Sequence, residues 1–147
     1  MSDHLADMNA RAVDREQRSF DALPSSARLA RRFVSETLRL YGAADELISD
    51  YSLVVSELAT NIIEHGDGST MVVFLDVADP GWWELEVAGG ATNPGSQLLR
   101  PETWTVAGSH ESSGRGLGIV RHLMDDIATS ISGGRVSIRC RRRRAAW

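Results

Sequence analysis

Lysine is missing from this sequence of 147 residues, and all sixteen basic residues are arginines. A Schiff-base lysine and the lysine of a phosphate-binding P-loop are therefore excluded. The single cysteine, Cys140, excludes an internal disulfide and a zinc site built from several thiolates. No apolar run approaches the roughly 18–20 residues that a membrane-spanning helix needs, and the N-terminus lacks the layout of a secretory signal. We therefore expect a cytoplasmic protein without a membrane segment.

Charge is distributed unevenly along the chain. The formal net charge is −4, yet five arginines, Arg139 and Arg141–Arg144, lie close together near the C-terminus. Residues 1–138 hold the other eleven arginines and all twenty acidic residues, which gives −9 for that part and +5 for the end. A body this acidic is a poor binder of nucleic acid. We interpret residues 142–147 as a solvated basic tail, with contact to an acidic partner as the alternative.

The pattern predicts one folded domain, residues 16–141, preceded by a flexible segment of residues 1–15. The hydrophobic fraction of 42% and the charged fraction of 24% are usual for one soluble domain of this length. Apolar periodicity and turn residues predict, in order, a strand (16–23), two helices (27–41 and 45–65), a hairpin (71–77 and 82–87), a helix (114–126) and a second hairpin (127–131 and 135–140). This order predicts an α+β fold, a two-layer sandwich in which a mostly antiparallel sheet carries helices on one face.

Local signals predict where these elements begin and end. Gly42 is the expected stop of the first helix, and Asp45 is the expected N-cap of the second. The stretch 88–113 between the first hairpin and the third helix is rich in glycine, serine, threonine and proline. A loop of that length in a compact domain is typical of a functional lid or of local disorder.

Two polar side chains interrupt the apolar surface of the second helix. Glu57 and Asn61 lie one turn apart, at the edge of the face that should be buried. A carboxylate and an amide in that position need partners, and a hydrated magnesium ion takes oxygen ligands of this kind. The alternative is a solvated Glu57 and an Asn61 that bonds to nearby backbone. His65 follows near the end of the helix, where the helix dipole alone accounts for it.

A second candidate site lies at the start of the third helix, in a glycine-rich segment. Glycines at alternate positions let backbone N–H groups approach an anion, and a helix N-terminus favours negative charge. The spacing matches neither a P-loop nor a dinucleotide-binding fingerprint, and a purely structural turn is the alternative. The segment consists of Ser113, Gly114, Arg115, Gly116, Leu117 and Gly118.

Together the two motifs resemble those of the GHKL (Bergerat-fold) ATPases, and most closely the branch of bacterial anti-sigma factor serine kinases. Residues 56–65, SELATNIIEH, are similar to the N-box of that family, and residues 113–120, SGRGLGIV, are similar to its second glycine box. The resemblance covers residues 17–141. It rests on both motifs in this order, since either one alone is only moderately specific.

The resemblance implies ATP and Mg²⁺ as cofactors and assigns roles to both motifs. Glu57 would be the general base, Asn61 would coordinate Mg²⁺, and the second glycine box, Ser113–Gly118, would close over the phosphates beneath an ATP lid. Gly89 and Gly90 would belong to the first glycine box. The implied reaction transfers the γ-phosphoryl group of ATP to a serine of a STAS-type anti-anti-sigma partner. A sigma factor, held when that partner is not engaged, and a homodimer are also implied, with a role in transcription and stress response.

The chain departs from the family pattern on the side of the purine. The family has an aspartate that accepts a hydrogen bond from the adenine amino group, and Gly89 stands in its place here. An unpaired amino group would cost about 1–3 kcal/mol of binding free energy. Val136 also stands where the family often has a threonine. The alternative function is therefore a module of this fold that binds nucleotide poorly and regulates a partner by binding alone.

Overall fold

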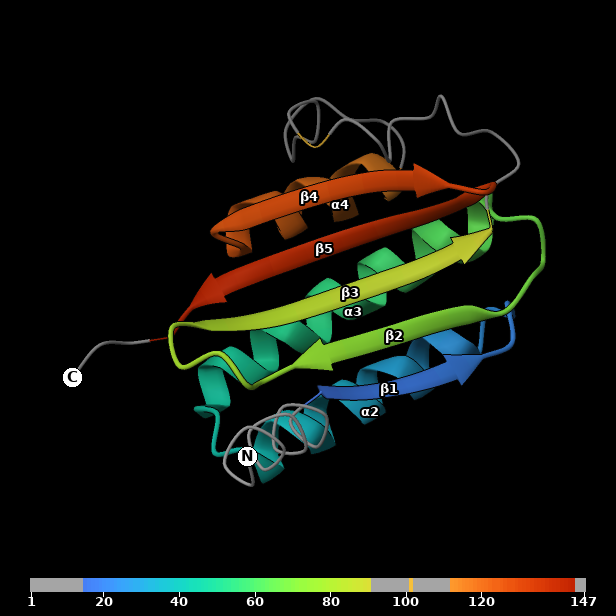
Figure 1. The fold of residues 1–147 in the computed structure, drawn as a ribbon. Coiled ribbons are helices and arrows are strands. Elements are labelled where there is room, and N and C mark those ends of the chain that lie inside the picture. The colour runs from blue at the N-terminus through green and yellow to red at the C-terminus, as the bar shows by residue number, and fades with distance from the viewer. Residues whose placement is uncertain (1–14, 91–100, 102–111, 145–147) are drawn as a thin grey trace, which may run out of the picture.

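Five antiparallel strands form one sheet, and three helices cover one of its faces (Figure 1). A computed structural model describes residues 15–90, 101 and 112–144, and these counts refer to those residues. In chain order the elements are β1 (Arg15–Phe20), α2 (Ser26–Leu40), α3 (Asp45–His65), β2 (Met71–Asp76), β3 (Trp82–Gly90), α4 (Ser112–Leu123), β4 (Asp126–Ser132) and β5 (Arg135–Arg143). The predicted α+β sandwich with an antiparallel sheet is confirmed.

The strands lie in the order β1-β2-β3-β5-β4 across the sheet. β3 and β5 form its centre and pair over nine residues, from Trp82 opposite Arg143 to Gly90 opposite Arg135. Both predicted hairpins are present, one pairing β2 with β3 and the other β4 with β5. Because α4 lies between β3 and β4 in the chain, the second hairpin joins the sheet through β5, next to β3.

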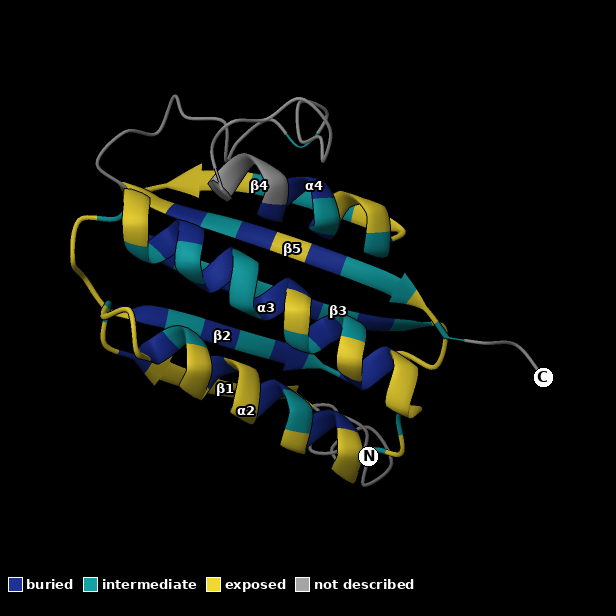
Figure 2. Ribbon diagram, turned by 180° about the vertical axis from the view of Figure 1, so that it is seen from behind, coloured by how far each residue is buried: buried dark blue, intermediate teal, exposed yellow. Residues whose placement is uncertain are grey.

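Alternation along the strands separates a buried face of the sheet from an open one. In β2, Met71, Val73 and Leu75 are fully buried, whereas the residues between them are half-buried. The buried set faces the helices, and α3 lies across the middle of the sheet between α2 and α4 (Figure 2). α3 therefore contributes more residues to the core than either neighbouring helix, including the fully buried Tyr51 and Leu58.

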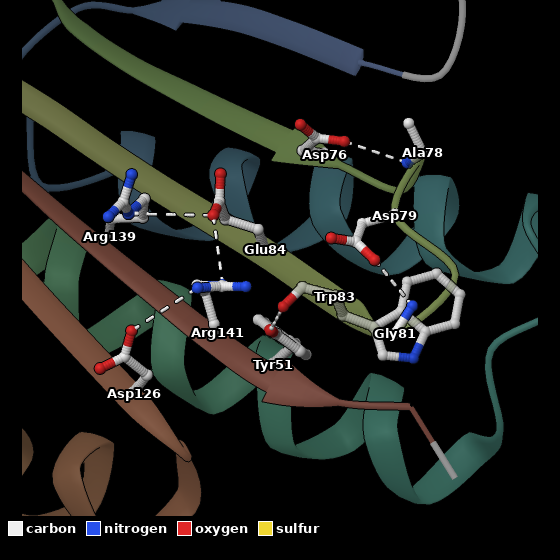
Figure 3. A network of polar contacts seen from close by, with 10 residues as sticks. All are labelled: Tyr51, Asp76, Ala78, Asp79, Gly81, Trp83, Glu84, Asp126, Arg139 and Arg141. Carbon is white, nitrogen blue, oxygen red and sulfur yellow. Dashed lines mark hydrogen bonds and ion pairs between the residues drawn. The ribbon is translucent and has the colours of Figure 1, made fainter. Parts of the chain in front are cut away.

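The open face of the sheet carries a row of charges along β3 and β5 (Figure 3). The carboxylate of Glu84 lies between two arginines, 3.8 Å from Arg139 Nε and 3.6 Å from Arg141 Nε. Arg141 also pairs with Asp126 at 3.9 Å, and its guanidinium carbon lies 4.2 Å from the centre of the Trp82 ring. The arginine-rich end of the sequence is thus a strand that alternates charged residues outward with apolar residues inward.

This alternation makes the last strand longer than predicted. β5 continues to Arg143, three residues beyond Cys140, because Arg141 and Arg143 extend the outward row without breaking the period of two. Two residues that we placed in the basic tail are therefore strand residues. Residues 1–14 and 145–147 lie outside the described part, as does most of the predicted lid, 88–113.

Two predicted helix ends also differ from the structure. Asp45 is the first residue of α3 and not its N-cap, a position taken by Ala44, whose backbone is extended and whose side chain cannot accept a hydrogen bond. Asp45 and Glu46 instead lie in the first turn, where the helix dipole favours acidic residues. α4 begins at Ser112, earlier than predicted, and ends at Leu123 rather than near residue 126. None of the described helices combines the length and the hydropathy needed to cross a bilayer.

Candidate functional site

Asn61 places an unpaired acceptor in the interior of the protein. Its side chain is only 1% exposed, and its Nδ2 donates a hydrogen bond of 2.7 Å to the backbone carbonyl of Glu57 one turn earlier. The other side-chain atom, Oδ1, is buried without a hydrogen-bond partner. A buried acceptor left unpaired costs free energy, so its presence favours a ligand that supplies a donor or a cation. The Asn61 side chain therefore suits an oxygen-seeking ion.

Glu57 lies against α4 at the one place where that helix has no side chain. A Cβ atom on Gly116 would lie 2.7 Å from Glu57 Cδ and would overlap the carboxylate. Only glycine allows this approach of α3 and α4, which is a tertiary reason for glycine inside a helix. The structure thus brings Glu57 and Asn61 of α3 together with the second glycine segment.

The glycine segment is helical, whereas we predicted a turn before the helix. Ser113–Gly118 all belong to α4, so the N–H groups left free by the helix are those of its first four residues, 112–115. Gly116 and Gly118 are buried, and Leu117 packs into the core with 2% of its surface exposed. The side chains of residues 112–115, Ser113 and Arg115 among them, lie outside the described part of the structure.

Burial also changes the acid–base behaviour of Glu57. Partial removal from water raises the pKa of its carboxyl group, and the negative charge of Glu64 raises the pKa further. A carboxylate with a raised pKa holds a proton more readily, which is the property that a proton acceptor in catalysis needs. His65 is exposed at the last position of α3.

The end of β3 supplies a closed apolar wall where the resemblance would place a carboxylate. Gly89 is buried opposite Val136 of β5, and a Cβ atom on Gly89 would overlap the Cγ2 methyl of Ile62. An aspartate at position 89 does not fit while Ile62 holds this position. Sequence reasoning missed the role of Ile62, although it directly follows Asn61 on the same helix.

Asp67 is the acidic residue nearest to the end of β3. Its backbone N–H donates a hydrogen bond of 3.2 Å to the Gly90 carbonyl, and its carboxylate lies where a Cβ of Gly90 would be. Hydrogen bonds from Ser69 hold the pKa of Asp67 below its usual value. Successive residues of a strand face opposite sides of the sheet, so Asp67 beside Gly90 lies on the other side from Ile62. It does not supply the acceptor that Gly89 lacks.

No three histidine, cysteine, aspartate or glutamate side chains gather into a metal-binding cluster in the described ranges. A divalent ion at this site would therefore take few ligands from the protein, Asn61 Oδ1 first among them. Magnesium is commonly bound in this way, by one or two protein oxygens together with phosphates and water.

The sequence and the structure were compared with known proteins. A family model described as "histidine kinase-like ATPase domain" matches residues 20–141. The sequence matches no curated protein at a significant level. Among solved structures, the SiaB–SiaC complex from Pseudomonas aeruginosa is similar, with a TM-score of 0.69 and 15% identity over 95% of this chain and 96% of that chain.

A second similar structure is that of the RsbU and RsbW domains of Rv1364c from Mycobacterium tuberculosis. The TM-score is 0.64 at 21% identity, and the match covers 90% of this chain. The chain spans only 33% of that longer protein. Both likenesses show a shared fold.

Glu57→Gln should make the folded protein more stable at neutral pH. Because the folded pKa of Glu57 is raised, the stability linked to its bound proton is present at low pH and is lost as the pH rises through the folded pKa. Glutamine removes the unfavourable charge, so its advantage should vanish as the pH falls below the usual carboxyl range. Urea unfolding over a series of pH values measures this difference.

The matched control is Glu36→Gln, the same substitution at an exposed residue of α2 that pairs with Arg32. It should bring no stabilisation at neutral pH. An equal effect of both substitutions would contradict the assignment of the effect to burial.

Proposed function

The chain belongs to the histidine kinase-like ATPase domain family, and on that premise we propose that it is an ATP-dependent protein-serine kinase of the anti-sigma type. The substrate would be a serine of a STAS-type anti-anti-sigma partner. The same chain would hold a sigma factor while that partner is not engaged. The membership itself implies nucleotide binding, and the remaining steps are the content of the proposal.

One observation carries this proposal: the unpaired, buried Oδ1 of Asn61 next to the Glu57 carboxylate. Asn61 Oδ1 is the atom that would coordinate Mg²⁺, which supplies charge neutralisation to the triphosphate when bound. The free N–H groups at the start of α4 would bind the phosphate oxygens. These groups suit the phosphate half of a nucleotide, because they offer an oxygen ligand and hydrogen-bond donors together.

Glu57 would accept the proton of the attacking serine hydroxyl. Its carboxylate is held against Gly116, at the helix whose N-terminus would bind the phosphates. Its raised pKa suits a proton acceptor, because a base with a higher proton affinity removes the hydroxyl proton more readily. Phosphoryl transfer depends on alignment and charge neutralisation, which this arrangement would provide without any covalent intermediate.

The two structural neighbours support a protein partner. One was solved as a SiaB–SiaC complex, and the other contains an RsbW domain next to an RsbU domain. The GHKL resemblance of the motifs points to the STAS-type partner, the sigma factor and a homodimer. It also points to a cytoplasmic role in regulating transcription under stress.

A second function is favoured by the apolar wall at Gly89. Ile62 and Val136 leave no acceptor for the adenine amino group on the helix side of β3. A chain with this wall would bind ATP weakly and could control its partner by binding alone. The two functions differ first in whether Mg-ATP binds at all.

Asn61→Ala should abolish the binding of Mg-ATP. The substitution removes the unpaired acceptor along with one hydrogen bond, so we expect the free energy of unfolding to change by less than about 1.5 kcal/mol. Isothermal titration calorimetry of the wild-type and variant proteins measures the binding, and urea unfolding measures stability. The control is Thr60→Ala, a half-buried neighbour on the same helix. A wild-type protein that gives no heat with millimolar Mg-ATP would favour the second function.

ATP and ITP should bind with similar affinity. The two nucleotides differ at the purine amino group, and Gly89 provides no carboxylate to distinguish them. We expect their dissociation constants to agree within about threefold. In the double variant Ile62→Ala/Gly89→Asp, which makes room for a carboxylate, ATP should bind about tenfold more tightly than ITP. A strong preference of the wild-type protein for ATP would contradict the inert wall.

Glu57→Gln should slow phosphoryl transfer without releasing the partner. Loss of the proton acceptor should lower the rate by about a hundredfold or more, while partner binding stays within a factor of about two because the charge is needed for transfer only. Transfer of radiolabelled phosphate from ATP to a candidate STAS protein gives the rate, and calorimetry with the same protein gives the affinity. The control is again Glu36→Gln. If partner binding is lost together with transfer, Glu57 has a structural role.

A further inference from the structure

A second hollow lies at the other end of α3, away from Glu57 and Asn61. It has a volume of about 590 Å³ and is formed by the turn between α2 and α3, the start of β3 and the end of β5. The lining residue Leu47 precedes Glu57 by ten residues of α3, which corresponds to about 15 Å along the helix axis. The volume is in the range of pockets that bind ligands.

Three consecutive arginines, Arg142–Arg144, line this hollow, and two of them keep an uncompensated charge. Arg142 forms an ion pair with Asp50 of α3. Within the described part of the chain, Arg143 and Arg144 form no ion pair with a carboxylate. Arg144 donates to the Val77 carbonyl at 2.7 Å, and its Nε is buried without a hydrogen-bond partner. Two positive charges are thus available to a ligand.

Aromatic and aliphatic groups form the rest of the lining. The guanidinium carbon of Arg144 lies 3.7 Å from the centre of the Trp83 ring, which holds this arginine in place. Trp83 is itself fixed, because Tyr51 of α3 donates a hydrogen bond of 2.8 Å to its backbone carbonyl (Figure 3). Tyr41 and Leu47 complete the apolar part. The hollow therefore offers a rigid apolar surface beside fixed cationic groups.

The charge around the hollow determines the class of ligand. Glu46 is the one carboxylate among the lining residues, so the arginines leave a local excess of positive charge in a chain whose net charge is −4. An extended polyanion such as nucleic acid would meet the acidic surface beyond the hollow and be repelled. A short stretch of carboxylates would meet only the arginines, and each guanidinium can bind a carboxylate through two hydrogen bonds.

We infer that this hollow binds an acidic segment of a partner protein, with an apolar side chain of that segment against Trp83 and Tyr41. The carboxylates of the segment pair with Arg143 and Arg144. This site does not depend on nucleotide binding, because none of its residues lies near Glu57, Asn61 or α4. It gives the chain a grip on a protein that is separate from the site of phosphoryl transfer.

The test uses the full chain and a fluorescein-labelled peptide, Glu-Asp-Leu-Phe-Asp-Glu, followed by fluorescence polarisation. The control peptide, Gln-Asn-Leu-Phe-Asn-Gln, has the same shape without charge. We expect the acidic peptide to bind and the amide peptide to bind at least about tenfold more weakly. Arg143→Glu should weaken binding of the acidic peptide by about tenfold, and Glu46→Gln should tighten it about twofold by removing a repulsive charge.

The matched control variant is Arg28→Glu, which makes the same change of charge on the exposed side of α2. It should change the affinity by less than about twofold. Equal losses for Arg28→Glu and Arg143→Glu, equal binding of both peptides, or no binding at millimolar protein would each overturn the inference. Full displacement by inorganic phosphate would identify a small-anion site instead. A change of sedimentation in Arg143→Glu would identify a contact between two copies of the chain.

Discussion

The approach of α4 to α3 at Gly116 is the constraint on which the proposed catalytic site depends. Because position 116 has no side chain, the Glu57 carboxylate can lie against the backbone of α4. The same approach places the first turn of α4, with its free N–H groups, at the end of α3 that carries Asn61. A methyl group at position 116 would meet the carboxylate itself, which is the flexible end of its side chain and the group that the proposed chemistry uses. The requirement for glycine is therefore functional as much as structural.

The two halves of the proposed nucleotide site differ in chemical character. On the phosphate side, a buried amide oxygen lacks a partner and a carboxylate is partly desolvated. Both features cost the free protein some stability, and a bound cation and phosphates would offset that cost. On the purine side, Gly89, Ile62 and Val136 pack as an ordinary core without an unpaired polar group. Polar groups that would recognise a ligand are thus concentrated where the triphosphate would lie.

Much of the fold could be predicted from the sequence, because its signals are local. The period of two in 71–77 and the helical spacing in 45–65 each depend on one segment, and both elements exist as predicted. The end of β5 could not be predicted in this way, since a row of arginines has the composition of a tail. Only pairing with Trp82 and Glu84 across the sheet makes those arginines strand residues.

The juxtaposition of the candidate site also depends on packing between distant segments. The spacing of Glu57 and Asn61 predicts that they share one side of a helix, but nothing in it predicts that Asn61 Oδ1 lacks a partner. The overlap of Ile62 with position 89 is a tertiary contact between a helix and a strand, and sequence periodicity does not encode such distances. Likewise, the glycine segment could be recognised as unusual, whereas its helical conformation follows from the side chains it packs against, such as Leu117 in the core.

The length of α3 sets the geometry of any regulation by a partner. Its 21 residues form a rod of about 30 Å, with the arginine-lined hollow near its first turn and Asn61 near its last. A compound of nucleotide size is too short to touch both ends at once, whereas a small folded protein could cover both. A protein held at the first turn could therefore stay attached while nucleotides exchange at the far end. Any competition between the two ligands would have to pass through movement of the rod itself.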